Sequence, residues 1–391
     1  MKIAEKFKSW FLSPEEKDFI NSRKNIFPKS KSDKIILIQC PQDINYVNEF
    51  AKVTNDNLSF KLVGVHPNIN FPSIFNFFLM RGIHLYFIRR KWEKLYKKIG
   101  IDYFIYPKNI IFFDYLNNFL FALKVFVNLK SKTELLELKY SGIKCGDLIY
   151  DSYLRYNKKA TVRISDPLLI FYFFLCFNQI SAFKRLILIN GKNIISYYSS
   201  YSTYTSHGIP IRILLNNNIN VFTLSTYVKN SLAYKNLKFP DFTHVKTHWN
   251  FIKLFEKLDC KEKLIEEGLK QFKKRFEGKN KIIYMKNDPF SIQGGKIKLG
   301  IKLEGVVFLH DFFDSPHIYN SMVFEDFYEW TVYTLEYALK KNLKIGFKPH
   351  PNQSIESKNL INGLKEKYPS ITWIDENTSN NTIFNSGIKF G

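Results

Sequence analysis

The sequence predicts an α/β protein in which parallel sheets are covered by helices. Apolar, β-rich runs alternate along the chain with longer amphipathic stretches, as they do in proteins built of successive β–α units. The strand candidates are apolar throughout rather than at every second residue, which is typical of strands buried on both faces of a sheet. The 391 residues are enough for roughly two to three domains.

The first half of the chain contains most of the strand candidates. We predict strands at residues 34–40, 60–65, 102–106, 110–113, 186–189 and 220–224. Residues 41–51 and 209–215 have the apolar spacing of helices. We interpret the apolar run 168–177 as a buried helix, because a membrane span needs about twenty residues.

The second half repeats the alternation after a helical, Lys- and Glu-rich stretch at residues 246–281. We predict strands at 305–309, 344–347 and 371–374, and helices at 324–341 and 356–368. We place a domain boundary within 227–242 and divide the chain into residues 1–235 and 236–391. Residues 387–391 look like the beginning of a strand that lacks its helix, so we expect the second domain to be incomplete.

The chain carries a formal net charge of +23, from 58 Lys and Arg against 35 Asp and Glu. Part of this surplus reflects a composition rich in Lys, Asn, Ile, Phe and Tyr, as in AT-rich genomes. A basic surface attracts nucleic acid, anionic lipid, or phosphorylated and acidic sugars. Because no nucleic-acid-binding motif is found, we expect no nucleic-acid partner. The aromatic content of 17% excludes a disordered chain.

Cysteine use and the N-terminus predict a cytoplasmic protein. The four cysteines form no CxxC pair, which argues against a zinc module and a disulfide scaffold. Residues 1–19 alternate charged and apolar side chains, unlike a signal peptide. Peripheral contact with the inner leaflet of the membrane is the alternative that we keep open.

The most specific chemical motif is Lys348-Pro349-His350-Pro351, directly after a predicted strand. The two prolines fix the backbone where it leaves the sheet and aim His350 into the crevice at the carboxyl end of the strand, where open α/β sheets bind ligands. A cationic Lys348 and a hydrogen-bonding His350 suit a phosphate leaving group. The alternative is a turn in which His350 caps a nearby group.

A second cluster, residues 309–317, also follows a predicted strand. Asp311 and Asp314 are candidates for a general base, and His310 or His317 for a phosphate contact. The spacing matches no zinc site, and we expect no metal. An Asx-rich turn that caps the next helix is the alternative.

Two further motifs lie in the first half of the chain. His207 precedes a predicted helix, where the positive end of the helix dipole favours anions. Asp147 and Asp151 share one helical face, with Arg155 one turn further along. A structural His207 and a salt-bridged helix start are the alternatives.

The order of these motifs resembles bacterial capsular and surface polysaccharide biosynthesis proteins, and the His-Pro pair is similar to that of bacterial sialyltransferases and Kdo transferases. No P-loop, nucleophile elbow or dinucleotide-binding GxGxxG competes with this interpretation. The resemblance begins near Ile143 and rests on residues 146–155, 204–212, 310–317, 327–330 and 348–351.

The resemblance implies a glycosyltransferase of the GT-B architecture, with two Rossmann-like doubly wound domains facing each other across a cleft. Residues 1–235 would then bind an oligosaccharide or glycolipid acceptor, and residues 236–391 a nucleotide-sugar donor, with CMP-linked sugars among the candidates and no cofactor. The alternative is a non-catalytic assembly protein that binds anionic glycan or a membrane surface. The implied donor-side residues are Lys348, His350, Pro351, His310 and His317, the implied catalytic residues Asp311, Asp314 and His207, and the implied acceptor-side residues Asp147, Asp151, Arg155 and Arg212.

Overall fold

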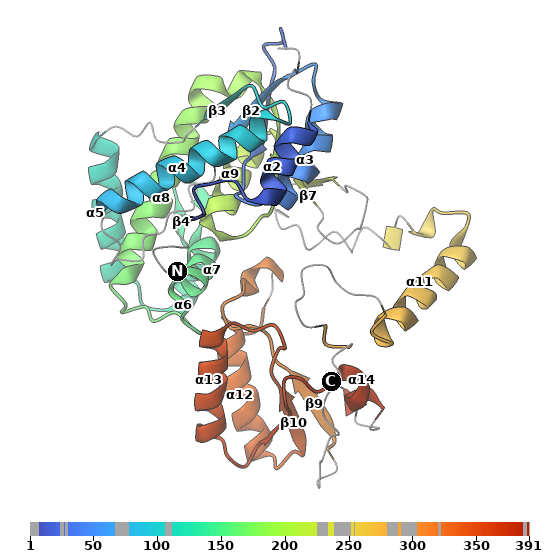
Figure 1. The fold of residues 1–391 in the computed structure, drawn as a ribbon. Coiled ribbons are helices and arrows are strands. Elements are labelled where there is room, and N and C mark those ends of the chain that lie inside the picture. Colours follow the sequence, from blue (N-terminus) through green and yellow to red (C-terminus); the bar gives the residue numbers. More distant parts are fainter. Residues whose placement is uncertain are drawn as a thin grey trace. The chain divides into compact units, whose positions relative to one another are not determined.

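The structure is a computed structural model, and it forms two compact units (Figure 1). Unit 1 comprises Met1–Ser152 and Ile164–Lys246, and unit 2 comprises Tyr153–Arg163 and Thr247–Gly391. The two units do not test the predicted division into domains at residues 235/236, which stays a prediction. The residues that the structure describes are 8–23, 27, 30–66, 78–105, 112–224, 234–237, 252–253, 255–279, 288–290, 303–319, 322–385 and 389–390.

Unit 1 is built on a six-stranded sheet with the order β3-β2-β1-β6-β7-β8. All neighbouring strands are parallel except β7 and β8. Strands β2 and β3 lie on one side of β1, and strands β6, β7 and β8 lie on its other side. The strand order therefore reverses between β1 and β6. The strands are β1 (Ile35–Gln39), β2 (Lys61–Val65), β3 (Tyr103–Ile105), β6 (Ile194–Ser199), β7 (Asn220–Leu224) and β8 (Tyr234–Leu237).

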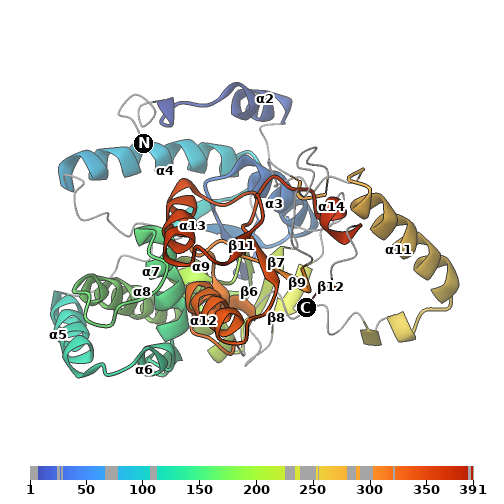
Figure 2. The ribbon, with the colours of Figure 1, turned by 90° about the horizontal axis from the view of Figure 1, so that it is seen from below.

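Helices cover both faces of this sheet. Figure 2 shows α3 and α4 on one side of the sheet, and α8 and α9 on the other. Every residue of β1 is buried, as expected for a central strand between two helical layers. The helices of the unit are α2 (Pro14–Ser22), α3 (Ile44–Asp56), α4 (Phe78–Lys97), α5 (Phe112–Asn128), α6 (Lys132–Leu136), α7 (Gly146–Asn157, which ends in unit 2), α8 (Leu168–Asn190) and α9 (Tyr204–Asn216). A short hairpin, β4 (Lys139–Tyr140) and β5 (Ile143–Lys144), precedes α7.

Two strand predictions in this unit are wrong. Residues 186–189 continue α8, and the strand is the following segment, β6. Periodicity cannot separate a short apolar run in a strand from one in a buried helix, and the Tyr- and Ser-rich composition of β6 concealed a real strand. In the predicted strand 110–113, Phe112 and Phe113 begin α5, and the other two residues lie outside the described ranges.

The apolar run 168–177 is helical, as predicted, and forms the first part of α8. Within the described part of the chain, Leu168–Asn193 is the one helical stretch that is long and apolar enough to cross a membrane by length and composition. However, 56% of the apolar 18-residue segment within this stretch is buried inside the protein. Core helices of soluble proteins are also long and apolar enough to meet this criterion.

Unit 2 contains a four-stranded parallel sheet with the order β11-β10-β9-β12. In Figure 1, α12 and α13 lie on one side of this sheet and α14 on the other. The strands are β9 (Gly305–Phe308), β10 (Ile345–Lys348), β11 (Thr372–Trp373) and β12 (Lys389–Phe390), and the helices are α11 (Lys261–Phe276), α12 (Phe327–Lys340), α13 (Ile355–Lys367) and α14 (Asn380–Phe384).

The two helices predicted in this unit are confirmed, and side-chain caps fix their starts; α12 begins at Phe327 and not at Phe324, so Asp326 caps the helix instead of lying in its first turn. Asp326 lies at the N-cap of α12 and accepts a hydrogen bond from the Glu329 amide. Ser354 caps α13 by accepting from the Ser357 amide. Such caps satisfy N–H groups that have no partner inside the helix.

The sheets and helices of the two units make the chain a mixed α/β protein with a mainly parallel central sheet flanked by helices.

The packing around the first residue of α7 gives a stability prediction. A Cβ atom on Gly146 would overlap the carbonyl oxygen of Leu135. We expect Gly146→Ala to lower the free energy of unfolding by about 1–3 kcal/mol, because backbone on both sides must shift. Gly268→Ala is the control, since Gly268 lies in α11 with open space around it and alanine should stabilise that helix by about 0.5–1 kcal/mol. Urea unfolding measures both, and equal stability of Gly146→Ala and the wild type would contradict the packing described.

Candidate functional site

The carboxyl ends of β9, β10 and β11 bring the motifs of unit 2 to one edge of its sheet. Leu309-His310-Asp311 follows β9, and Lys348 is the last residue of β10. Because the three strands are parallel neighbours, the residues that follow them lie along the same edge. Open α/β sheets bind their ligands at this edge.

Lys348 is a buried cation at this edge. Its side chain is almost fully covered, and its Nζ lies 5.9 Å from the centroid of the Phe308 ring. Burial lowers the pKa of Lys348 to about 8, although the charges of Asp375 and Glu376 oppose this shift. Within the described ranges, the ammonium makes no hydrogen bond and no ion pair. Because a buried ammonium without such partners is costly, an anionic ligand at this position would be bound favourably.

His350 presents a hydrogen-bond donor beside Lys348. The Nδ1 atom of His350 accepts a hydrogen bond from the Asn352 amide at 3.1 Å. A neutral imidazole that accepts at Nδ1 carries its proton on Nε2. Burial lowers the pKa of His350, and the neighbouring His310 charge lowers it further. His350 is therefore neutral near pH 7, with Nε2–H as a donor.

His310 lies next to His350, with ring centroids 6.1 Å apart. Its ring stacks on Phe327 at 4.3 Å, which fixes its orientation. The Nδ1 atom of His310 is 3.9 Å from Oδ2 of Asp314, a carboxylate that is partly exposed. These contacts link one imidazole to the other and to an accessible carboxylate.

The carboxylate of Asp311 accepts hydrogen bonds from two backbone amides. Its Oδ1 accepts from the Phe313 amide at 3.0 Å and its Oδ2 from the Ser354 amide at 3.2 Å. The second bond ties the loop after β9 to the start of α13. This arrangement corresponds to the turn-forming alternative for Asp311, and it leaves Asp314 as the more accessible carboxylate.

The remaining donor-side predictions lie in the same unit. Pro351 is buried, and with Pro349 it brackets His350 as the chain leaves β10. His317 lies in the short 3₁₀ helix η3 (Pro316–Tyr319) instead of in a loop that directly follows a strand. Their assigned roles stay predictions.

The sequence analysis missed Asp375 and Glu376, which follow β11 at this edge. The Glu376 carboxylate accepts from Gln353 Nε2 at 2.7 Å and from Lys358 Nζ at 2.5 Å. These bonds connect the loop after β11 to the loop before α13 and to α13 itself. Because the strand before them was predicted, their place directly after it was a usable signal.

In unit 1, a polar cluster occupies the point where the strand order reverses between β1 and β6. Gln39, the last residue of β1, is fully buried. Its Oε1 accepts from Ser199 Oγ at 3.0 Å, from the Ser200 amide at 3.1 Å and from Ser200 Oγ at 2.8 Å. His207 Nδ1 lies 3.0 Å from the same oxygen. An Nδ1–H donated to this oxygen leaves Nε2 of His207 as a proton acceptor.

This cluster also holds buried polar atoms that have no hydrogen-bond partner in the described part of the chain, namely Gln39 Nε2, Thr203 Oγ1 and Ser206 Oγ. Tyr204, the first residue of α9, has a φ of +58°, an uncommon conformation for a large side chain. Unpaired buried groups and backbone outliers both occur preferentially at functional sites. Gln39 was not predicted, because a glutamine at the end of an apolar strand has no sequence signature.

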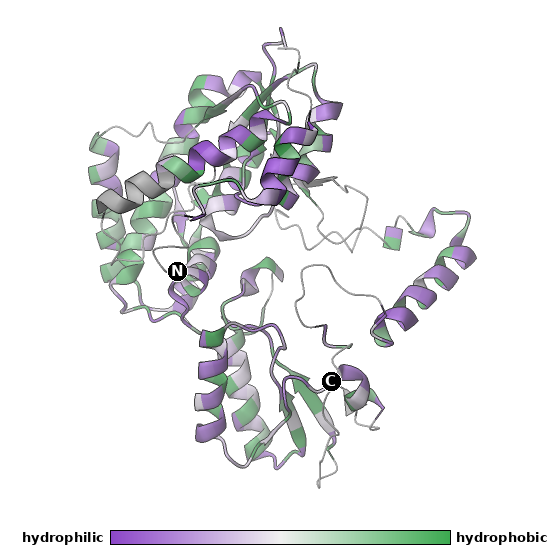
Figure 3. Cartoon of the chain, viewed as in Figure 1, coloured by the Kyte–Doolittle hydropathy of each residue, from purple (hydrophilic) through white to green (hydrophobic). Residues whose placement is uncertain are grey.

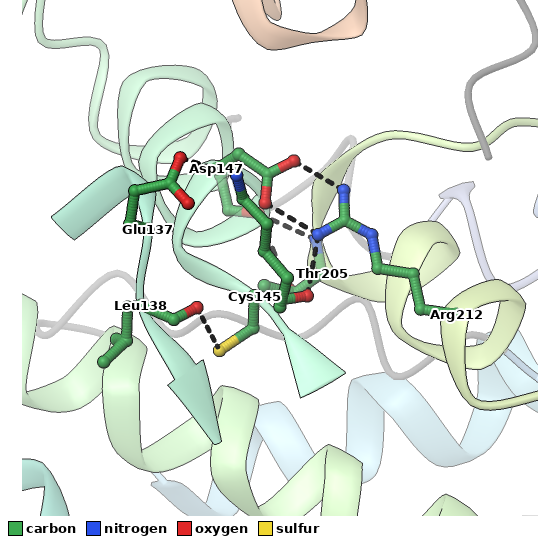
Figure 4. Close-up of polar contacts among 8 residues, drawn as sticks. Glu137, Leu138, Cys145, Asp147, Thr205 and Arg212 are labelled. Atoms are coloured by element: carbon green, nitrogen blue, oxygen red, sulfur yellow. Dashed lines mark hydrogen bonds and ion pairs between the residues drawn. The ribbon is translucent and has the colours of Figure 1, made fainter. Parts of the chain in front are cut away.

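Asp147 and Arg212 form an ion pair with each other (Figure 4). The two Arg212 nitrogens donate to the two Asp147 oxygens at 2.7 and 2.5 Å, and Nη1 also donates to the Lys144 carbonyl at 2.7 Å. The pair fastens α7 to α9, and Arg212 is buried. Of the other acceptor-side predictions, Asp151 is buried and Arg155 is exposed.

His207 belongs to unit 1, whereas Lys348, His350 and Asp311 belong to unit 2 and share one edge. Among the described residues, no three His, Cys, Asp or Glu side chains are grouped so that they could hold a metal ion.

Comparisons with known proteins add no family to this description. Neither a protein-family model nor a curated protein sequence matches the chain. Among solved structures, the chain is similar to a CDPS from Fluoribacter dumoffii, with 13% sequence identity and a TM-score of 0.32 over 57% of this chain and 95% of that one. A TM-score of 0.32 is too low to indicate a shared fold.

Proposed function

We propose that this chain is a glycosyltransferase of the GT-B architecture, which transfers a sugar from a nucleotide-activated donor to a capsular or lipopolysaccharide acceptor. The observation that carries the proposal is the grouping of Lys348, His350 and His310 at the carboxyl edge of the unit 2 sheet. There, a buried ammonium that makes no ion pair or hydrogen bond among the described residues lies beside the Nε2–H donor of His350.

These groups suit the leaving group of glycosyl transfer. The acceptor hydroxyl oxygen forms the new bond to the anomeric carbon, while the bond from that carbon to the donor phosphate oxygen breaks. The electron pair of the broken bond stays on the phosphate, where Lys348 and His350 Nε2–H stabilise it. The proton of the acceptor hydroxyl passes to a base.

The candidates for this base are Asp314, Asp311 and His207. Asp314 is favoured within unit 2, because it is partly exposed and its second oxygen lies near His310. The Asp311 oxygens already accept two backbone N–H groups. In unit 1, His207 can donate Nδ1–H to Gln39, which makes Nε2 the nitrogen that could accept a proton.

The test compares His350→Ala with His350→Gln in a transfer assay with CMP-, UDP- and GDP-linked sugars. We expect His350→Ala to lower the transfer rate about 100-fold or more, as the loss of one positioned donor does in other enzymes. His350→Gln should recover part of the rate, because its side-chain amide can donate from a similar position. Unchanged transfer by His350→Ala, with an unaltered circular dichroism spectrum, would overturn the proposal.

A further inference from the structure

Helix α5 is the outermost helical layer on one side of unit 1. It packs on α8, and α8 packs in turn on α9, which contacts the sheet through β6 and β7. Figures 1 and 2 both show α5 beside α8 at the margin of the unit. The inner side of α5 contributes Asn118, which donates to Asn178 and Ser181 of α8.

The outer side of α5 is apolar, the reverse of what an outer helix normally presents to water. Phe112, Phe113 and Val127 are 74%, 71% and 79% exposed. At helical spacing they lie on the same side as further exposed apolar residues, namely Tyr115, Leu116, Phe119 and Leu120. Figure 3 shows green, apolar segments along α8 and, alternating with purple ones, along α5. Such a contiguous apolar face marks a surface that contacts something other than water.

The charges on and around α5 favour a lipid surface over a protein as its partner. The 17 residues of α5 contain one acidic and one basic side chain, Asp114 and Lys124. Lys124 is exposed at the border of the apolar face, and Lys130 and Lys132 follow directly after the helix. The net charge of +23 opposes association with a second copy and attracts an anionic surface.

We propose that the exposed face of α5 docks unit 1 onto a lipid bilayer that contains anionic lipids. The phenylalanine and leucine side chains enter the boundary between headgroups and acyl chains, and the flanking lysines contact the headgroups. The helix lies on the bilayer and does not cross it, since its inner side is packed on α8. This inference is independent of the donor site.

The test measures flotation of the full chain with two kinds of vesicle, phosphatidylcholine alone and phosphatidylcholine mixed with phosphatidylglycerol. We expect binding to the mixed vesicles that weakens at high salt. The triple variant Phe112→Gln/Leu116→Gln/Leu120→Gln should bind at least about tenfold more weakly, because it removes the apolar contact and retains helix-forming residues. Lys124→Gln should reduce binding to the mixed vesicles only.

The matched control is Tyr333→Gln/Tyr337→Gln/Leu339→Gln, which changes three exposed apolar residues on α12. It should bind vesicles within about twofold of the wild type, because these residues lie outside the α5 face. Thermal unfolding confirms that each variant is folded. Absence of wild-type binding, or equal binding by the α5 variant, would overturn the proposal. The proposal would also be overturned if the wild type were a dimer that does not bind vesicles and the α5 variant were a monomer. The exposed face of α5 would then bind a second copy of the chain.

Discussion

Lys348→Met is expected to weaken binding of the nucleotide-sugar donor roughly 10- to 100-fold, the range for loss of one charged hydrogen bond. Methionine keeps most of the apolar stem in the buried position of Lys348 and removes only the ammonium. Isothermal titration with the donor measures the loss. Lys344→Met is the matched control, because Lys344 is exposed at the opposite end of β10. Equal affinities of Lys348→Met and the wild type would contradict a phosphate at this position.

The same lysine predicts the pH dependence of donor binding. Burial lowers the pKa of Lys348 to about 8, so the group is charged below that pH and neutral above it. The affinity of the wild type for the donor should therefore fall as the pH rises through about 8. Lys348→Arg keeps its charge throughout this range, so its affinity should not fall there. A wild-type affinity that is constant to well above this pH would contradict the role of the ammonium.

Arg212→Met is expected to lower the free energy of unfolding by about 3–5 kcal/mol, because it leaves the Asp147 carboxylate without its partner in a largely buried setting. Arg155→Met is the matched control, since Arg155 is exposed, and it should change stability by less than about 0.5 kcal/mol. Urea unfolding monitored by circular dichroism measures both values.

A double variant separates the ion pair from the packing of its side chains. Asp147→Leu/Arg212→Met removes both charges, and it should recover much of the stability that Arg212→Met loses. The single variant Asp147→Leu completes the comparison. If the double variant loses as much free energy of unfolding as Asp147→Leu and Arg212→Met lose together, the unpaired charge is not the cause of the loss. If Arg212→Met matches the wild type, the pair does not fasten α7 to α9.

The candidate site of unit 2 was predictable because its signals are local. Each of its strands is a short apolar run that ends in polar residues, as in Phe347-Lys348-Pro349-His350, so a parallel sheet implies a shared edge. The groups that each of these side chains contacts were not predictable. Asp311, which was a candidate base, accepts backbone amides from two loops, and this depends on how the start of α13 packs beside β9.

Unit 1 was predicted less well because its decisive features are long-range. Gln39 and His207 are far apart in the sequence, and they meet only because β6 pairs with β1. The spacing of Asp147, Asp151 and Arg155 suggested pairing along one helix, whereas Asp147 pairs across to Arg212 of α9. The exposed apolar face of α5 was hidden as well, because its first residues looked like a strand.

The central claim is that the carboxyl edge of the unit 2 sheet binds the phosphate of a nucleotide-sugar donor. The most direct test is the thermal unfolding midpoint of the wild type, Lys348→Met and Lys344→Met with saturating CMP-, UDP- or GDP-linked sugars. We predict that one nucleotide class raises the midpoint of the wild type and of Lys344→Met, and raises that of Lys348→Met by clearly less. No rise with any nucleotide, or an equal rise in Lys348→Met, would contradict the claim.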